Sequence, residues 1–439
     1  MSDFQGVAGM HDLLPEDHEY FTFIKKVIRY NGRRSGFKRI SVPALEHESM
    51  IFSSCGTLQM ECAEHLFKID GPETLYLRSN MRSGIARAYI EHNMQELPKP
   101  VEYYYIEPSW RRDVADNSLR QFYQFGFELL GEQDPALDAQ LIEMCKRIFE
   151  DLGLKGVKLR INSVGTKEDR IPYEEALRNF YAGKERSLCE KCVKRFERSP
   201  MMLIECTEED CKILANLAPK MSQFLSKNSK QHYEKVKEYL TTLEISFEED
   251  PFMLRDFLYY TGLIFEFYVE REDREIELGG GGRYDNLIKD MGGADTPAVG
   301  FAAGMERVTE LMKEIHIRVP SKDKAHVFMV QLGEDAKRIA LKLVSELRKA
   351  GIKTVGALGK DSIRSQLESA GKIDVKYALV MGQMEVHEKK IIVRDMKKGT
   401  QEIMPLDSIV EHLVELIGPE HLDTKDFQGM IEEASESDE

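Results

Sequence analysis

The order of expected strands and helices changes near Pro320, and this change constrains the fold more than any single motif. Before it, strand-like segments rich in aromatic and β-branched residues follow one another, and helical segments gather elsewhere. After it, strands and helices alternate up to residue 418. Strands beside strands are typical of an antiparallel α+β sheet, whereas alternation is typical of an α/β layer. The sequence therefore predicts two domains, residues 1–320 and 321–418.

The first domain is expected to be an antiparallel sheet with a helical insertion. Apolar spacing predicts helices over residues 17–34 and 136–153. Strands are expected over residues 37–46 (ending near Pro43), 74–79, 101–111, 121–131, 157–165 and 259–270. The segment of about residues 171–250 is mostly helical and charged and contains four of the seven cysteines, so we interpret it as an insertion.

The second domain begins after a polar linker, residues 313–324. Strands are expected over residues 325–333, 352–359, 377–382 and 389–396, and helices over 334–351, 361–374 and 408–418. Its basic residues are candidates for phosphate contacts, and the alternative is that they are ordinary solvated charges. They are Arg348, Lys349, Lys353, Lys360 and Arg364.

Composition excludes several classes of protein. The chain of 439 residues is too long for one ordinary core, and no run of about 18 apolar residues predicts a membrane span. The N-terminus lacks the features of a signal peptide, and the cysteines do not resemble a disulfide framework, so we expect a cytoplasmic protein. The net charge is −15, and the expected disordered, acidic tail, residues 419–439, has almost no apolar side chains to bury.

One candidate site lies on a predicted strand–loop–strand hairpin that begins at Arg111. Period-two alternation places Gln124, Gly126 and Glu128 on one face of the second strand. A glutamine and a glutamate on one sheet face could bind a small polar ligand, with Arg111 projecting over it. The alternative is a polar face turned to solvent.

Three further motifs contain glycine or arginine. The segment Gly300–Val308 places small residues before Glu306 and Arg307, where another backbone or a flat ring could approach closely. The second motif is the segment Arg255–Gly262. In the third, Gly279–Asp285, four glycines predict a flexible turn whose N–H groups could face an anion. The alternatives are close helix–sheet packing and a loose hairpin.

Together these motifs resemble the class II aminoacyl-tRNA synthetases, and within that class the histidyl-tRNA synthetases. Residues 36–46 resemble motif 1, the Arg111 hairpin resembles motif 2, and residues 300–307 resemble motif 3. The order of the segments GMHDLLP, QFGFELLG, RDFLYYTGLIFE, GGGGRYDNL and TPAVGFAAGMER is specific to the histidyl family. Residues 321–418 resemble its anticodon-binding domain. The likeness covers about residues 5–418.

The resemblance implies activation of histidine by ATP with Mg²⁺ and transfer of histidyl to tRNA(His). Arg111 would contact the α-phosphate and the histidine carboxylate, with Arg255 beside the same phosphate. Arg307 would hold the distal phosphates. Positive charge there stabilises the phosphorane-like transition state. It also implies a homodimer built around the motif 1 segment that includes Pro43.

The same resemblance implies a histidine pocket. Gln124 and Glu128 match its residues, and Glu128 would accept a hydrogen bond from the imidazole N–H. Tyr260 would bond the other ring nitrogen, and Tyr259 is a further candidate for substrate binding. A donor–acceptor pair of this kind rejects isosteres without ring nitrogens.

Three segments depart from the family pattern. Where the family has Leu-Arg-Pro-Glu-Gly-Thr, this chain has residues 77–82, so Asn80 replaces the carboxylate expected to bind the substrate ammonium. Arg82 would put a positive charge near that ammonium, which Coulomb repulsion disfavours. Residues 112–118 lack the usual Glu-Arg pair, and Leu258 replaces an aspartate. A non-catalytic tRNA-binding or regulatory paralogue, or activation of another small acid, are therefore alternatives to the plain enzyme.

The predicted insertion contains a cysteine cluster. A CxxC pair, Cys189 and Cys192, is followed fourteen residues later by Cys206 and Cys211. This spacing is compatible with tetrahedral zinc, and the alternative is four reduced thiols.

Overall fold

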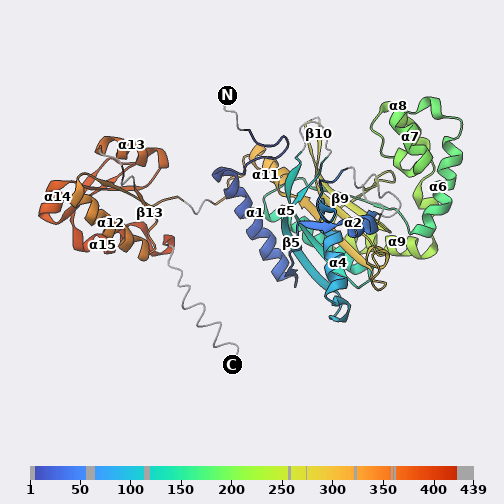
Figure 1. The fold of residues 1–439 in the computed structure, drawn as a ribbon, viewed down its shortest axis with the longest axis horizontal. Coiled ribbons are helices and arrows are strands. Elements are labelled where there is room, and N and C mark those ends of the chain that lie inside the picture. The colour runs from blue at the N-terminus through green and yellow to red at the C-terminus, as the bar shows by residue number, and fades with distance from the viewer. Residues whose placement is uncertain are drawn as a thin grey trace. The chain divides into compact units, whose positions relative to one another are not determined.

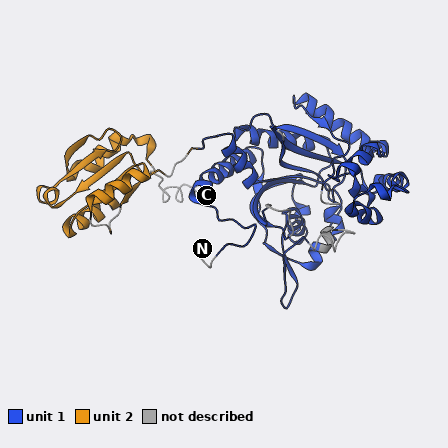
Figure 2. Cartoon of the chain, turned by 90° about the horizontal axis from the view of Figure 1, so that it is seen from above, with its two compact units in different colours: residues 1–319 blue, residues 320–439 orange. Residues whose placement is uncertain are grey.

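The chain divides into two compact units, residues 1–319 and 320–439, in the computed structural model (Figure 2). The structure describes residues 5–55, 65–112, 119–255, 259–272, 274–320, 324–356, 359 and 362–422. Each unit has its own buried apolar core.

A sheet of eight strands forms the centre of unit 1 within the described residues (Figure 1). The inner strand pairs are antiparallel, and the pair at each edge is parallel. This confirms the predicted α+β fold of the first domain. In spatial order the strands are β1 (Lys38–Arg39), β5 (Val101–Trp110), β6 (Gln121–Leu130), β11 (Ala298–Gly304), β10 (Arg274–Arg283), β9 (Leu263–Arg271), β7 (Lys158–Ser163) and β8 (Glu248–Glu249).

The alternation of side chains decides which face of this sheet becomes the core. On β6, Phe125, Phe127 and Leu129 point to the face that four helices cover, whereas Gln124 and Glu128 point to the other face. The four helices carry apolar stripes that complete the main core. They are α1 (Pro15–Arg34), α5 (Pro135–Asp151), α9 (Lys227–Thr242) and α11 (Met305–Glu314).

The segment of residues 37–46, expected to form a strand that ends near Pro43, has a short strand before Pro43 and a second strand, in a different sheet, after it. β1 pairs with β5 of the large sheet, and β2 pairs with β4 of a three-stranded sheet. Pro43 lies between them and has no N–H for a ladder, which accounts for the break. The small sheet and its neighbours comprise β2 (Leu45–His47), β4 (Leu75–Leu77), β3 (Lys68–Ile69), α2 (Glu48–Cys55), α4 (Arg82–Glu91), η2 (Met94–Glu96) and α10 (Leu287–Asp290).

Short helices after β7 form a module with a separate core. Tyr173, Leu177 and Tyr181 of its first helix pack against buried cysteines and methionines of the later turns. The elements are α6 (Lys167–Tyr181), η3 (Glu185–Ser187), α7 (Glu190–Arg198), η4 (Pro200–Leu203), α8 (Glu209–Leu217) and η5 (Met221–Gln223). The next helix, α9, returns to the main core through Tyr233 and Val236.

The prediction of a flexible turn at Gly279–Gly282 was wrong. These glycines lie in the buried half of β10, between β9 and β11. A Cβ built on Gly281 would lie 1.9 Å from the Gly300 carbonyl oxygen, and one on Gly279 would lie 2.5 Å from the Ala303 Cβ. The glycines therefore allow the central strands to approach closely, and such close approach of two backbones is a common reason for glycine within a strand.

Unit 2 is an α/β layer, as the alternation predicted. Its sheet has the order β13-β12-β14-β15-β16, parallel at the first three strands and antiparallel at the last three. The strands are β12 (Val327–Gln331), β13 (Thr354–Gly356), β14 (Tyr377–Met381), β15 (Lys390–Asp395) and β16 (Gln401–Pro405). The helices are α12 (Glu334–Lys349), α13 (Ile363–Ile373), α14 (Gln383–Glu388), η6 (Leu406–Ser408), α15 (Ile409–Ile417) and η7 (Pro419–His421).

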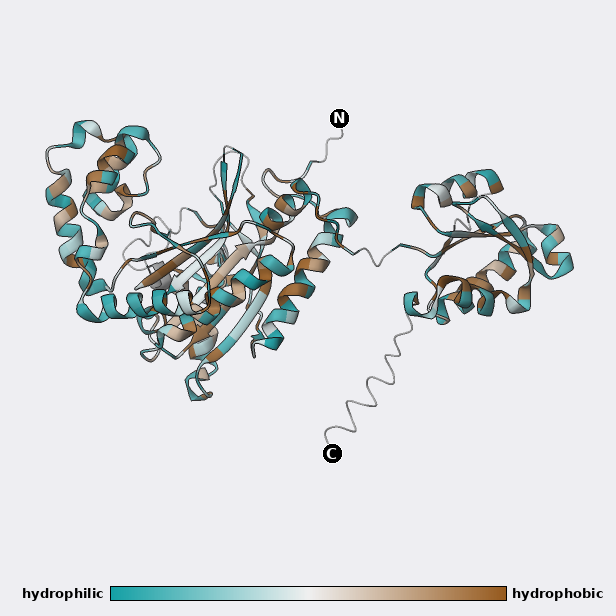
Figure 3. Cartoon of the chain, turned by 180° about the vertical axis from the view of Figure 1, so that it is seen from behind, coloured by the Kyte–Doolittle hydropathy of each residue, from teal (hydrophilic) through white to brown (hydrophobic). Residues whose placement is uncertain are grey.

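Hydrophobic residues concentrate on the strands and on one stripe of many helices (Figure 3). Among the described helices, none is both long enough and apolar enough to cross a membrane.

The close approach of β10 and β11 yields a test. We expect Gly281→Ala to destabilise unit 1 by about 1–3 kcal/mol, because the added methyl group collides with the Gly300 carbonyl. Gly304→Ala is the matched control, since a Cβ there would meet nothing within 4 Å. Urea unfolding followed by circular dichroism measures both variants. Equal midpoints for the two variants would contradict the close packing.

Candidate active site

The face of the large sheet opposite the main core carries small residues in its middle and polar residues beside them. The small residues are Gly300, Ala302 and Gly304 on β11 and Gly280 and Gly282 on β10. Gln124 and Glu128 on β6 lie on one side, and Glu266 on β9 lies on the other. A Cβ at Gly304 would meet open space, so the end of β11 leaves room above the sheet.

Glu128 is the buried carboxyl group of this face. Its side chain has no exposed surface, and its carboxylate occupies the space that a side chain at position 300 would take, because a Cβ on Gly300 would lie 1.5 Å from Oε2. The Tyr284 hydroxyl donates to Oε2 at 2.7 Å, and the Tyr105 hydroxyl donates to Oε1 at 3.4 Å. Burial raises the pKa of Glu128 to about 7, although Arg82 and the hydroxyls act in the opposite direction.

Arg82, the first residue of α4, pairs with Glu128. Its Nε lies 3.2 Å from Glu128 Oε1, and its Nη1 donates to the Tyr260 hydroxyl and, at 3.4 Å, to the Tyr259 hydroxyl. The guanidinium lies 5.4 Å from the ring centre of Tyr260 and 5.7 Å from that of Tyr284. Burial lowers the pKa of Arg82, but Tyr260 and Glu128 raise it more, so the group is charged. Its Nη2 is buried without a hydrogen-bond partner.

Gln124 and Asn80 lie in less enclosed positions. Gln124 Oε1 accepts a hydrogen bond from the Ser109 hydroxyl at 3.3 Å. Asn80 is half-buried just before α4, where its Oδ1 accepts from the Ser83 N–H at 3.5 Å and its Nδ2 donates to the Ser79 hydroxyl at 3.4 Å. Asn80 therefore makes local contacts at the start of the helix.

Two arginines meet one carboxylate at the other side of the face. Arg255 lies between Glu266, at 3.1 Å, and Glu277, at 3.2 Å. Arg307 lies 3.5 Å from the Glu277 carboxylate and donates to its carbonyl oxygen at 3.0 Å. Burial and the nearby Glu277 raise the pKa of Glu266 to about 7. The structure thus brings Arg255 and Arg307 together through Glu277, a residue that the sequence analysis missed.

Arg111 lies just after β5, where its N–H donates to the Arg120 carbonyl at 2.9 Å. Its guanidinium lies 5.2 Å from the ring centre of Phe122, which is on the same face as Gln124. The start of α11 is fixed to the same hairpin, because Glu306 accepts the Tyr123 N–H at 2.8 and 3.0 Å. Residues 113–118 of the loop, and Leu258, lie outside the described residues.

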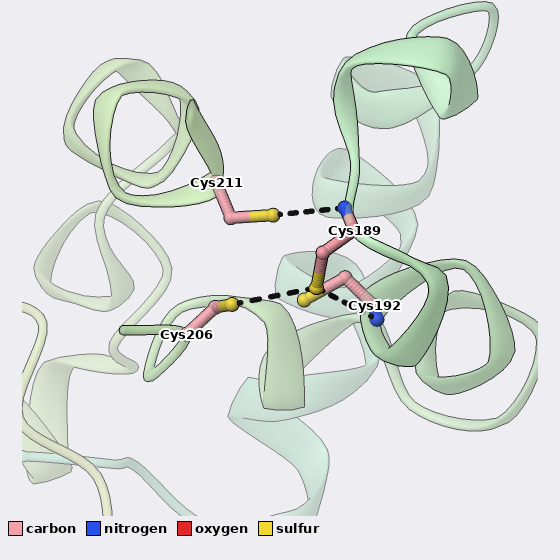
Figure 4. A group of neighbouring side chains, drawn as sticks. All are labelled: Cys189, Cys192, Cys206 and Cys211. Atoms are coloured by element: carbon pink, nitrogen blue, oxygen red, sulfur yellow. Dashed lines mark hydrogen bonds between the residues drawn. The ribbon is translucent and has the colours of Figure 1, made fainter. Parts of the chain in front are cut away.

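The four cysteines of the helical module converge (Figure 4). Their sulfur atoms all lie within 4.8 Å of one another, and the Cys189 and Cys206 sulfurs are 3.8 Å apart. The Cys192 N–H donates to the Cys189 sulfur at 3.4 Å, and the Cys189 N–H donates to the Cys211 sulfur at 3.2 Å. Cys192, Cys206 and Cys211 are buried, and Cys189 is half-buried.

Comparison with known proteins decides the family. The profile described as "Histidyl-tRNA synthetase" matches residues 9–308, and that described as "Anticodon binding domain" matches residues 326–416. The chain belongs to the histidyl-tRNA synthetase family. The histidine–tRNA ligase of Dehalococcoides mccartyi is 35% identical over 410 residues, covering 93% of this chain and 98% of the relative. That of Aquifex aeolicus is 34% identical over 410 residues, covering 93% and 100%.

Solved structures agree with this assignment. The apo histidyl-tRNA synthetase of Staphylococcus aureus matches with a TM-score of 0.78 and 31% identity, covering 93% of this chain and 99% of that one. The family likeness extends over both units, since the two profiles lie within residues 1–319 and 320–439 respectively.

The structure changes the interpretation of one departure from the family pattern. We expected Arg82 to repel a substrate ammonium, but its guanidinium is turned onto Glu128 and Tyr260, the two residues expected to bind the imidazole. Tyr105 and Tyr284, whose hydroxyls donate to Glu128, were not predicted from the sequence. Tyr284 lies two residues after the four glycines, and a hydroxyl at that place in the motif was the one feature that could have indicated a partner for a buried polar group.

The candidate phosphate-binding residues of unit 2 are not equivalent. Arg348 donates from Nε and Nη2 to the Thr354 carbonyl at 3.0 and 2.9 Å, so it ties α12 to β13. Arg364 is exposed and pairs with Glu368 at 3.3 Å. Lys349 is exposed on the last turn of α12, and Lys360 lies outside the described residues.

Proposed function

We propose that the protein is a cytoplasmic histidine–tRNA ligase, which activates histidine with ATP and transfers it to tRNA(His). One arrangement carries the proposal: Gln124 and Glu128 share a sheet face with Glu266, which Arg255 contacts beside Arg307. Tyr259 and Tyr260 join Glu128 through Arg82. The first group suits an imidazole, and the second suits a polyphosphate.

The arginines would act on the nucleotide. A carboxylate oxygen of histidine attacks the α-phosphorus, and the bond to pyrophosphate breaks. Arg111 and Arg255 would stabilise the negative charge that builds up on the α-phosphate, and Arg307 would hold the departing phosphates. Arg255 and Arg307 now neutralise Glu277 and Glu266, so ATP must compete with these carboxylates.

Magnesium fits the same cluster. Glu266 and Glu277 offer the carboxylate oxygens that Mg²⁺ prefers, together with phosphate oxygens. Mg²⁺ would neutralise phosphate charge. Its binding to these carboxylates would also release the two arginines toward ATP.

A non-catalytic, tRNA-binding or regulatory paralogue is the second candidate. The specific observation in its favour is Arg82, which makes contacts with Glu128 and Tyr260 that the imidazole would otherwise make. In that case ATP and tRNA binding would persist without histidine activation.

The primary test is histidine-dependent exchange of pyrophosphate into ATP, followed by charging of tRNA(His). We expect activity, and we expect Arg255→Ala to lower the exchange rate by about 10²–10³-fold, as loss of one charge-stabilising donor does elsewhere. Arg274→Ala is the matched control, because its side chain is 65% exposed and pairs with Glu314 at 2.6 Å.

Separating the two units gives a second experiment. Residues 1–319 alone should retain exchange, whereas charging of tRNA should require the full chain, because unit 2 is the anticodon-binding-like part. Absence of exchange with any amino acid, together with retained tRNA binding, would contradict the ligase and favour the paralogue.

We also propose a homodimer built around the motif 1 segment. Leu45 on β2 and Ile69 on β3 are 40% and 41% exposed on the small sheet, whose first strand follows Pro43, and burial of these side chains in a partner would favour association. Light scattering at micromolar concentration should give about twice the chain mass of 50.5 kDa. A mass of one chain would contradict the dimer.

We propose that the four cysteines bind one structural zinc ion. Zinc bound by four thiolates at about 2.3 Å places the sulfurs about 3.8 Å apart. The 3.8 Å separation of Cys189 and Cys206, and the backbone N–H groups that point at two sulfurs, fit this arrangement. The helical module has a small core, which is the setting in which a metal adds stability.

Metal analysis of the purified protein tests the zinc site. We expect about one zinc per chain, loss of that zinc in Cys192→Ser/Cys206→Ser, and a lower melting temperature for the variant. Cys145→Ala is the control, because Cys145 is buried in the main core, away from the cluster. A metal-free protein whose melting temperature is unchanged by added zinc would refute the site.

A further inference from the structure

We propose that Arg82 is a built-in competitor of the amino-acid substrate: its guanidinium occupies the imidazole side of the pocket, and histidine enters only when Arg82 leaves it. This inference rests on the proposed function, because it regulates the same site. It assigns a regulatory role to a residue that stands where the family pattern has threonine.

The contacts of Arg82 coincide with those proposed for the substrate ring. Glu128 would accept from one imidazole nitrogen and Tyr260 would bond the other, yet Arg82 already donates to both. Guanidinium and imidazole are both flat groups with N–H donors at their edges. The two groups can therefore replace each other at this pair of oxygens, but they cannot bind there together.

Burial makes the overlap exclusive. Arg82, Glu128 and Tyr260 are 4%, 0% and 3% exposed. The guanidinium also lies near the rings of Tyr260 and Tyr284, at 5.4 and 5.7 Å, so it fills the place of a flat ring between aromatic neighbours. The guanidinium therefore contacts the same oxygens and rings that would enclose an imidazole.

The charges make the overlap a competition. A buried carboxylate that loses its cation is strongly disfavoured, so Arg82 leaves only when another donor reaches Glu128. An imidazole is such a donor. One Arg82 nitrogen, Nη2, is buried without a hydrogen-bond partner. This lowers the free energy needed to move the guanidinium out of the pocket.

Calorimetric titration of histidine into the full-length protein and into Arg82→Thr tests the inference. We expect the variant to bind histidine at least about 30-fold more tightly, since a charged hydrogen bond no longer has to be displaced. Arg87→Thr is the matched control, because Arg87 lies on the same helix and pairs with Glu46 and Glu91 outside the pocket. This control should bind histidine like the wild type.

Chemical rescue provides an independent readout. Methylguanidinium or imidazole should raise the melting temperature of Arg82→Thr and leave that of the wild type and of Arg87→Thr unchanged, because only the first has a vacant donor position beside Glu128. If Arg82→Thr does not fold, the wild-type protein alone still tests the inference. A dissociation constant for histidine below about 100 µM in the wild type would overturn the competition.

The outcomes separate this inference from the proposed function. Tight histidine binding by Arg82→Thr without pyrophosphate exchange in either protein would support the competition and contradict the ligase. Ordinary exchange by the wild type, with the same KM for histidine as Arg82→Thr, would support the ligase and overturn the competition. Binding of a dicarboxylic acid instead of histidine by the wild type, lost in Arg82→Thr, would also overturn it.

Discussion

The buried pair of Arg82 and Glu128 is the interaction on which the candidate site depends. A carboxylate in the middle of a sheet face is costly without a cation and hydrogen bonds. Here the cation comes from the start of α4, and the hydrogen bonds come from Tyr105 on β5 and from Tyr284 after β10. This pair therefore links α4 to the strands β5 and β6 and to the segment after β10.

Glycine makes that burial possible. Gly300 leaves the space that the Glu128 carboxylate fills, and the glycines of β10 let its backbone approach β11 and let the Arg255 guanidinium lie against the sheet. The resulting face has small residues in its middle, the proposed histidine pocket around Glu128 on one side and the proposed phosphate-binding cluster around Glu277 on the other. On both sides arginines neutralise carboxylates, so each ligand of the proposed reaction must displace an internal ion pair.

The sequence predicted the fold class because its alternation of apolar and polar residues directly encodes which strand face is buried. It did not predict that Gly279–Gly282 form a strand, because four glycines suit a turn and a close contact equally until the neighbouring strand is known. The partners Arg82 and Glu128 are 46 positions apart, and nothing local to either one indicates the other. The cysteine cluster was foreseeable, since its spacing alone suggests convergence.

A crystal structure of the wild-type protein grown with about 1 mM histidine and an unreactive ATP analogue tests the central claim most directly. We expect nucleotide beside Arg255 and Arg307, and an imidazole ring between Glu128 and Tyr260 only where Arg82 has left the Glu128 carboxylate, from which its Nε now lies 3.2 Å. An imidazole ring bound to Glu128 and Tyr260 while Arg82 keeps its contacts with the same two residues would contradict the competition.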